Sequence, residues 1–237
     1  MKGLENYPKL NCGRLLCNKG LTILVDRNID ARNHANLIRQ HEKSKNGIAI
    51  LEDTVLVSQL DRLLARDWPQ NTLFVFPGGG GELTKKLSRA WREYAHTEVF
   101  AKRFWKPGQD PFTLAGMILP NYFMPLAVEA IVVLDDVISS STTLKKLHET
   151  NAWRFPRAKW YGGAWVSQMP RGKFPSGIIG YEEIFVSVVI AGADEKRVPI
   201  VSLSTMLDDP KLAADYAQKH FVNSAIFLEC VEEIRNR

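Results

Sequence analysis

The stretch IVVLDDVISSSTTL, which occupies residues 131–144, decides the fold class of this chain. Its first four residues are apolar, and a short apolar run of this kind is typical of a strand buried inside a parallel sheet. The run ends in two carboxylates, Asp135 and Asp136, and five hydroxyl side chains follow two positions later. Residues 143–150 then read as a short helix. The stretch therefore predicts a strand, a loop and a helix in direct succession.

These residue types in this order predict an anion site beside a pair of carboxylates. Open α/β sheets bind ligands at the carboxyl ends of their strands, which is where the two aspartates fall. Backbone N–H groups at a helix start attract anions, and five hydroxyls would assist them here, those of Ser139, Ser140, Ser141, Thr142 and Thr143. Carboxylates accept hydrogen bonds from sugar hydroxyls and bind hydrated Mg²⁺. The pattern predicts a pocket for a sugar that carries phosphate.

A second apolar run, residues 73–76, precedes a glycine loop upstream. The loop consists of Pro77, Gly78, Gly79, Gly80 and Gly81, and a helix is expected after it over residues 82–96. Strand, glycine loop and helix are the usual parts of a phosphate site in α/β proteins, because glycine lets the backbone approach an oxyanion closely. An ATP-binding P-loop is excluded, since Leu83 and Thr84 stand where Gly-Lys is required.

With these two segments the chain resembles the type I phosphoribosyltransferases. That family carries four apolar residues, two acidic residues, two further positions and then a loop rich in Ser, Thr and Gly. The resemblance implies that Asp135 and Asp136 hold the ribose hydroxyls of phosphoribosyl pyrophosphate (PRPP) and are the candidate catalytic residues. It also implies that residues 139–143 bind the 5-phosphate, with Thr143 at the position of the family's final threonine.

The upstream loop and the segment after it extend the resemblance. The family places a tight loop that contacts the pyrophosphate where residues 77–81 stand. Residues 100–124 correspond to a mobile loop that closes over the reacting centre in that family. Its basic residues are candidates for a contact with the substrate, namely Lys102, Arg103 and Lys106.

The activity that the resemblance implies is transfer of a ribosyl 5-phosphate from PRPP to a nitrogenous base, with release of pyrophosphate. Mg²⁺ is the implied cofactor, brought in by the substrate, with Asp135 or Asp136 as a candidate ligand. A purine or pyrimidine is the expected acceptor by analogy. The resemblance is also compatible with a homodimer.

Two departures from the family pattern keep other functions open. Ser141 stands where glycine is usual, and no Arg or Lys lies near Gly78. Basic residues on the next helix could replace that charge, namely Lys85, Lys86 and Arg89, and so could the three of the mobile-loop segment. One alternative is a non-catalytic regulator that binds PRPP or a nucleotide. Another is an α/β fold that has lost the site.

Strands that alternate with helices predict an open, mostly parallel, twisted sheet flanked by helices. Further strands are expected at residues 21–25, 48–51 and 184–190, and further helices at 30–42, 53–65, 209–220 and 224–234. An aromatic segment rich in Gly and Pro covers residues 153–180. Four of its side chains could stack on a base, although ordinary packing is favoured, namely Trp153, Trp160, Tyr161 and Trp165. We expect one domain over residues 1–237, with its core at 48–192 and a hood formed by 1–47, 193–237 or both.

Composition and charge fit a cytoplasmic protein that handles phosphate. The chain has 237 residues, 45% of them hydrophobic and 24% charged, with a formal net charge of +5. No apolar run reaches the ~20 residues of a membrane helix, and residues 1–11 do not read as a secretory signal. Three cysteines without a pairing pattern predict plain thiols. No basic run with interleaved aromatics occurs, so polyphosphate substrates explain the charge at least as well as nucleic acid.

Overall fold

The computed structural model describes residues 8–17, 21–25, 48–99, 118–120, 126–138, 141–170, 178–192, 200–202, 207, 210–220 and 224–236. The chain divides into two compact units. The first comprises Met1–Leu15, Val57–Gln168 and Lys173–Val189, and the second comprises Leu16–Leu56, Met169–Gly172 and Ile190–Arg237. The expectation of one domain with a core at 48–192 stays a prediction.

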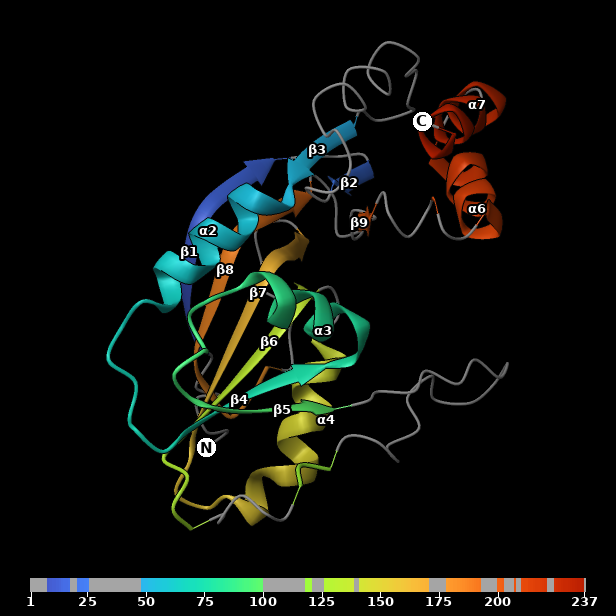
Figure 1. The fold of residues 1–237 in the computed structure, drawn as a ribbon. Coiled ribbons are helices and arrows are strands. Elements are labelled where there is room, and N and C mark those ends of the chain that lie inside the picture. Colours follow the sequence, from blue (N-terminus) through green and yellow to red (C-terminus); the bar gives the residue numbers. More distant parts are fainter. Residues whose placement is uncertain are drawn as a thin grey trace, which may run out of the picture. The chain divides into compact units, whose positions relative to one another are not determined.

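The first unit is built on a six-stranded sheet in the order β1-β8-β7-β6-β4-β5. Its strands are β1 (Lys9–Cys17), β4 (Thr72–Pro77), β5 (Ala95–Val99), β6 (Ala130–Ile138), β7 (Lys159–Pro170) and β8 (Tyr181–Gly192). The pairs β4–β5, β4–β6 and β6–β7 are parallel, and the arrows of all six strands point towards one edge in Figure 1. The prediction of an open parallel α/β sheet is therefore confirmed.

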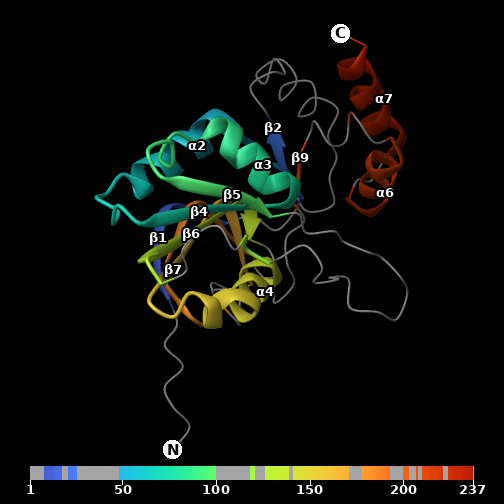
Figure 2. The ribbon, with the colours of Figure 1, turned by 60° about the horizontal axis from the view of Figure 1, so that its bottom comes forward.

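Helices cover both faces of this sheet (Figures 1 and 2). The helices α2 (Asp53–Leu64) and α3 (Gly78–Leu87) lie on one face, and α4 (Thr142–Asn151) lies on the other. Two adjacent glycines of β7 let these helices approach the sheet closely. A Cβ added to Gly163 would contact Leu60 of α2, and a Cβ added to Gly162 would contact Leu144 of α4. Within the described residues, no helix combines the length and apolarity needed to cross a membrane.

The central strands β4 and β6 form the buried core of the unit. Every residue of β4 is buried, and so are the first five of β6. Phe74 and Phe76 of β4 are fully buried, and burial of such a side chain contributes roughly 1.5–3 kcal/mol. Continuous apolar runs of this kind belong in strands covered on both faces, which explains why these two strands were predictable.

The helix expected over residues 82–96 ends much earlier than predicted. It begins at Gly78 and ends at Leu87, and residues 95–99 form β5 instead. A carboxylate from α2 terminates it, because Asp61 accepts hydrogen bonds from the Ser88 hydroxyl, from Arg89 N at 3.0 Å and from Ala90 N at 3.4 Å. These donors belong to a turn rather than to a further helical turn, so the chain leaves the helix there.

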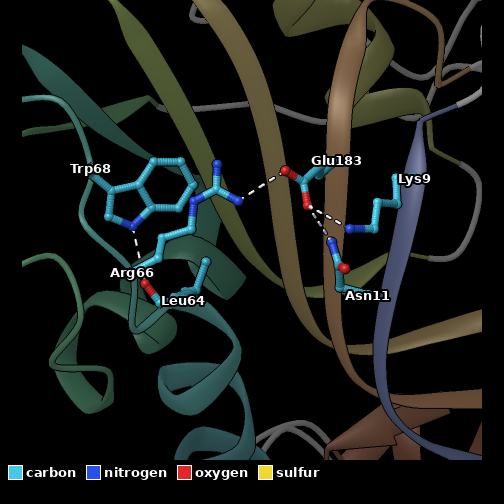
Figure 3. A network of polar contacts seen from close by, with 6 residues as sticks. All are labelled: Lys9, Asn11, Leu64, Arg66, Trp68 and Glu183. Atoms are coloured by element: carbon cyan, nitrogen blue, oxygen red, sulfur yellow. Dashed lines mark hydrogen bonds and ion pairs between the residues drawn. The ribbon is translucent and has the colours of Figure 1, made fainter.

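A polar network ties the residues just after α2 to two strands of the sheet, β1 and β8 (Figure 3). Arg66 Nη1 donates to Glu183 Oε1 at 2.9 Å, and its guanidinium lies 4.2 Å from the centre of the Trp68 ring. Asn11 Nδ2 of β1 donates to Glu183 Oε2 at 2.8 Å. Burial alone would raise the pKa of Glu183, but the hydrogen bonds from Arg66 and Asn11 and the charges of Arg66 and Lys9 outweigh it and lower that pKa.

The second unit contains a three-stranded parallel sheet in the order β3-β2-β9. Its strands are β2 (Leu21–Val25), β3 (Ile48–Glu52) and β9 (Ile200–Ser202), and its helices are α6 (Pro210–His220) and α7 (Ser224–Arg235). The strands predicted at 21–25 and 48–51 and the helices predicted at 209–220 and 224–234 are confirmed. The helix expected at 30–42 lies outside the described residues.

His148 should make the stability of the protein depend on pH. Burial beside Trp160, Tyr181 and Gly180 lowers the pKa of His148 below its usual 6.5, although the charge of Glu149 opposes this in part. A lowered pKa means that the folded state prefers the neutral ring. The stabilising contribution is complete above pH 6.5 and is lost as the pH falls through the folded-state pKa.

Urea unfolding at pH 8 and pH 5 measures this contribution directly. We expect the free energy of unfolding to fall between these two pH values, and we expect a smaller fall in a His148→Asn variant. Equal falls in the two proteins would contradict the assignment to His148.

Candidate functional site

The register of the sheet brings the acid pair level with the glycine loop. Val75 of β4 pairs with Val133 of β6. Two residues further along each strand stand Pro77, the last residue of β4, and Asp135. The acids therefore lie among the last four residues of β6 and are half-buried. Asp135 Oδ1 accepts the backbone N–H of Asp136 at 2.9 Å.

Gly80 lies directly against the two carboxylates. A Cβ built on Gly80 would lie 2.5 Å from Asp135 Oδ1 and closer still to Asp136 Oδ1, so no side chain fits between them. At Gly81 a Cβ would lie 2.5 Å from the backbone carbon of Phe76. The first turn of α3 therefore packs tightly on the ends of β4 and β6. This contact brings together the glycine run and the acid pair, which the sequence analysis assigned to one site.

The start of α3 is a helix N-terminus without a side-chain cap. Its N-cap residue is Pro77, which makes no side-chain cap hydrogen bond, and Gly78 follows with φ of 60°. The Thr84 hydroxyl donates to the Gly80 carbonyl at 3.0 Å, which supports a turn that contains four glycines. The N–H groups of a first helical turn lack intrahelical partners and attract anions. The turn beside the carboxylates can therefore bind an anion of its own.

The start of α4 has the backbone conformation that glycine favours. Ser141, its N-cap, has φ 57° and ψ 0°, and among the described residues it alone has positive φ without being glycine. It is 4% exposed and makes no side-chain cap hydrogen bond. Thr142 and Thr143 follow in the first helical turn and are half-buried, while Ser139 and Ser140 lie outside the described residues. This left-handed conformation is one that glycine adopts without strain, whereas a residue with a side chain pays for it.

A glycine at position 141 should therefore be tolerated and should raise stability slightly. The left-handed conformation costs a residue with a side chain about 1–2 kcal/mol. Glycine avoids this cost, but it loses more backbone entropy on folding, which offsets part of the gain in stability. We expect Ser141→Gly to raise the free energy of unfolding by up to about 1 kcal/mol, and Ser141→Val to lower it by at least about 1 kcal/mol. Thermal unfolding followed by circular dichroism measures both variants. A stabilised valine variant would contradict the backbone assignment.

The basic residues of α3 lie away from its start. Lys85 Nζ forms an ion pair with Glu98 of β5 at 2.6 Å, and Lys86 Nζ pairs with Glu82 at 2.8 Å. The hydrogen bond from Lys86 and its charge lower the pKa of Glu82. Both lysines belong to the last turn of the helix, and Arg89 lies beyond it, so none of the three stands at the glycine turn.

Of residues 100–124, which the resemblance matches to a loop of the family, the structure describes only residues 118–120. The segment's three basic candidates, Lys102, Arg103 and Lys106, lie outside the described residues. Leu119 is fixed to the end of α4, because its N–H donates to Asn151 Oδ1 at 2.9 Å and its carbonyl accepts from Arg154 Nη1 at 2.6 Å. The chain is therefore anchored at Leu119 to the C-terminal end of α4.

The donor atoms at the acid pair suit a magnesium ion that arrives with a phosphate ligand. Among the described residues no group of three or more His, Cys, Asp and Glu side chains could hold a metal ion. Mg²⁺ binds through one or two carboxylates together with substrate phosphates and water. Asp135 and Asp136 provide two half-buried carboxylates, so they fit an ion of that kind.

The aromatic side chains after α4 pack into the sheet for the most part. Trp160, Tyr161 and Trp165 are buried in β7, whereas Trp153 is 78% exposed. The sequence reasoning did not single out Tyr181, which is buried against α4. The available signal was the pair Gly162-Gly163, because glycines inside a strand mark a close approach of another element.

No family model matches the chain, and no curated protein matches it. One similar solved structure is a phosphoribosyltransferase. It is the Helicobacter pylori xanthine-guanine-hypoxanthine phosphoribosyltransferase, which is 18% identical over 64% of this chain and 86% of its own, with a TM-score of 0.39.

Proposed function

We propose that this chain binds PRPP with Mg²⁺ and transfers its ribosyl 5-phosphate to a nitrogenous base, with release of pyrophosphate. The observation that carries the proposal is the contact of Gly80 with the carboxylates of Asp135 and Asp136. It sets two acceptors for ribose hydroxyls beside a helix start that suits the pyrophosphate. The start of α4, with Ser141 in the left-handed conformation, supplies a second anion site for the 5-phosphate.

The chemistry asks for positioning and electrostatics rather than a covalent step on the protein. The bond from the anomeric carbon to the pyrophosphate oxygen breaks, and its electron pair leaves with the pyrophosphate. The lone pair of the base nitrogen forms the new bond, and the proton of that nitrogen passes to solvent. Asp135 and Asp136 would hold the ribose hydroxyls and stabilise positive charge on the ring. Bound Mg²⁺ would neutralise charge on the leaving pyrophosphate.

Two measurements on the full chain test the proposal. Titration calorimetry with PRPP should show binding that requires Mg²⁺. An assay of pyrophosphate release over a panel of purines and pyrimidines should then show turnover with at least one base. Absence of PRPP binding at any Mg²⁺ concentration would overturn the proposal.

A second candidate function is supported by the placement of the lysines. Lys85 and Lys86 are paired with Glu98 and Glu82 and belong to the last turn of α3, so neither provides a cation at the glycine turn. A protein that binds PRPP as a regulator needs no such cation for leaving-group chemistry. Tight binding without pyrophosphate release on any base would favour this regulator over the transferase.

A further inference from the structure

The first turn of α4 packs closely on the sheet because Gly162 of β7 has no side chain. Leu144 is 1% exposed and lies over Gly162 of β7. A Cβ on Gly162 would lie 2.7 Å from Ile184 Cδ1 and 3.4 Å from Leu144 Cδ1. Glycine at this position therefore lets the helix approach the sheet closely at the turn that follows Ser141.

A buried tyrosine holds the same turn by a hydrogen bond. The Tyr181 hydroxyl, at the start of β8, donates to the Leu144 carbonyl at 2.9 Å. Tyr181 is 4% exposed, and its ring lies 5.7 Å from the His148 ring and 6.0 Å from the Trp160 ring, measured between centroids. Burial raises the pKa of Tyr181 well above its usual 10, so the hydroxyl remains a donor at neutral pH.

The hydroxyl is not required for the helix itself. A carbonyl in the first turn of a helix already accepts the N–H of the residue four positions later. Phenylalanine would fill the same space against His148 and Trp160. The added bond therefore fixes where the first turn lies on the sheet, and with it the direction of the N–H groups that begin at Thr142.

We propose that Tyr181 is a positioning residue for the phosphate site at the start of α4, acting through the Leu144 carbonyl. This inference rests on the proposed function, because it takes the 5-phosphate as the anion bound there. The pyrophosphate would bind at the start of α3, on the opposite face of the sheet, and Tyr181 does not contact that helix in the hydrogen bonds and ring contacts of the described residues. The positioning role is therefore specific to one of the two anions.

Titration calorimetry on Tyr181→Phe tests this specificity with three probes, each with Mg²⁺: ribose 5-phosphate, PRPP and pyrophosphate. We expect the affinities for ribose 5-phosphate and PRPP to fall about three- to tenfold, the effect of one neutral hydrogen bond. The affinity for pyrophosphate should stay at the wild-type value. If the hydroxyl had only a structural role, its removal would lower the affinities for all three probes together or for none of them.

Two further variants complete the test. Tyr161→Phe makes the same change on the same sheet, beside Arg66 and away from α4, and should leave all three affinities unchanged. In Gly162→Ala the new methyl group would crowd Leu144 and Ile184, so this variant should show the same selective loss of affinity for ribose 5-phosphate and PRPP. It replaces Tyr181→Phe in the test if that variant fails to fold.

The outcomes separate the inference from the proposed function. If the wild type binds PRPP and both Tyr181→Phe and Gly162→Ala bind ribose 5-phosphate as tightly as it does, the inference is overturned and the function stands. Equal losses for pyrophosphate and ribose 5-phosphate also overturn the inference alone. If the wild-type chain binds none of the probes, the function and the inference fall together.

Discussion

Replacing both Asp135 and Asp136 with asparagine should weaken PRPP binding by at least about a hundredfold. Hydrogen bonds to charged groups contribute about 1.5–3 kcal/mol each. The double variant removes the charge from both carboxylates that would accept such bonds from the ribose. The free energy of unfolding should change by less than about 1 kcal/mol, because both side chains are half-buried and asparagine keeps their shape. Titration calorimetry and urea unfolding on the same preparations measure the two quantities.

The control for this variant is Asp67→Asn, which removes one charge at an exposed position of the same unit. It should leave the PRPP affinity within about twofold of wild type, because an exposed charge is screened by salt. The single variants Asp135→Asn and Asp136→Asn then show how the loss is shared. Wild-type affinity in the double variant would remove the acid pair from the site.

Replacing Gly80 with alanine should weaken PRPP binding by at least about tenfold. By helix propensity alone, alanine would stabilise α3 by about 1 kcal/mol. The new methyl group overlaps the carboxylate oxygens of Asp135 and Asp136, so either the acids rotate away or the first turn of α3 moves. Overpacking of this kind costs about 1–3 kcal/mol, and the cost falls on the groups that would hold the ligand. Calorimetry with PRPP and Mg²⁺ measures the loss.

Gly78→Ala is the matched variant in the same helical turn. Nothing lies within 4 Å of the Cβ position at Gly78, but its φ of 60° makes a side chain strained. This variant should lower stability by about 1–2 kcal/mol while the acid pair keeps its place. If the two variants lost stability and affinity in the same proportion, the contact of Gly80 with the acids would have no special role.

The buried strands were predictable because their apolar runs are too short for a helix and are followed by residues that break the run. Residues 73–76 and 131–134 are apolar without interruption, which suits strands covered on both faces. β7 was not foreseen, because Gly162 and Gly163 interrupt an aromatic stretch and glycine disfavours strands. The structure places those glycines under Leu144 and Leu60, so helix packing outweighs strand propensity. The end of α3 was also missed, because Asp61 acts on it from another helix.

The acid pair and the glycine run of the candidate site could be found in the sequence, but their contact could not. The acid pair and the glycine run each stand out in the sequence, and family resemblance assigned them to one ligand. That Gly80 touches the acids depends on the register of β4 against β6, which no local pattern encodes. The serine at position 141 departs from the family pattern, and its backbone adopts the left-handed conformation that glycine favours.

The helices α3 and α4 begin at the same edge of the sheet but pack on opposite faces. A single ligand that bound both helix starts would bridge the two layers of the unit. Amide hydrogen exchange in the first turns of both helices would then slow together on ligand addition, since opening either turn would require release of the ligand. A ligand bound by one helix alone would slow exchange in the first turn of that helix only. The exchange pattern therefore shows whether one helix start or both bind the ligand.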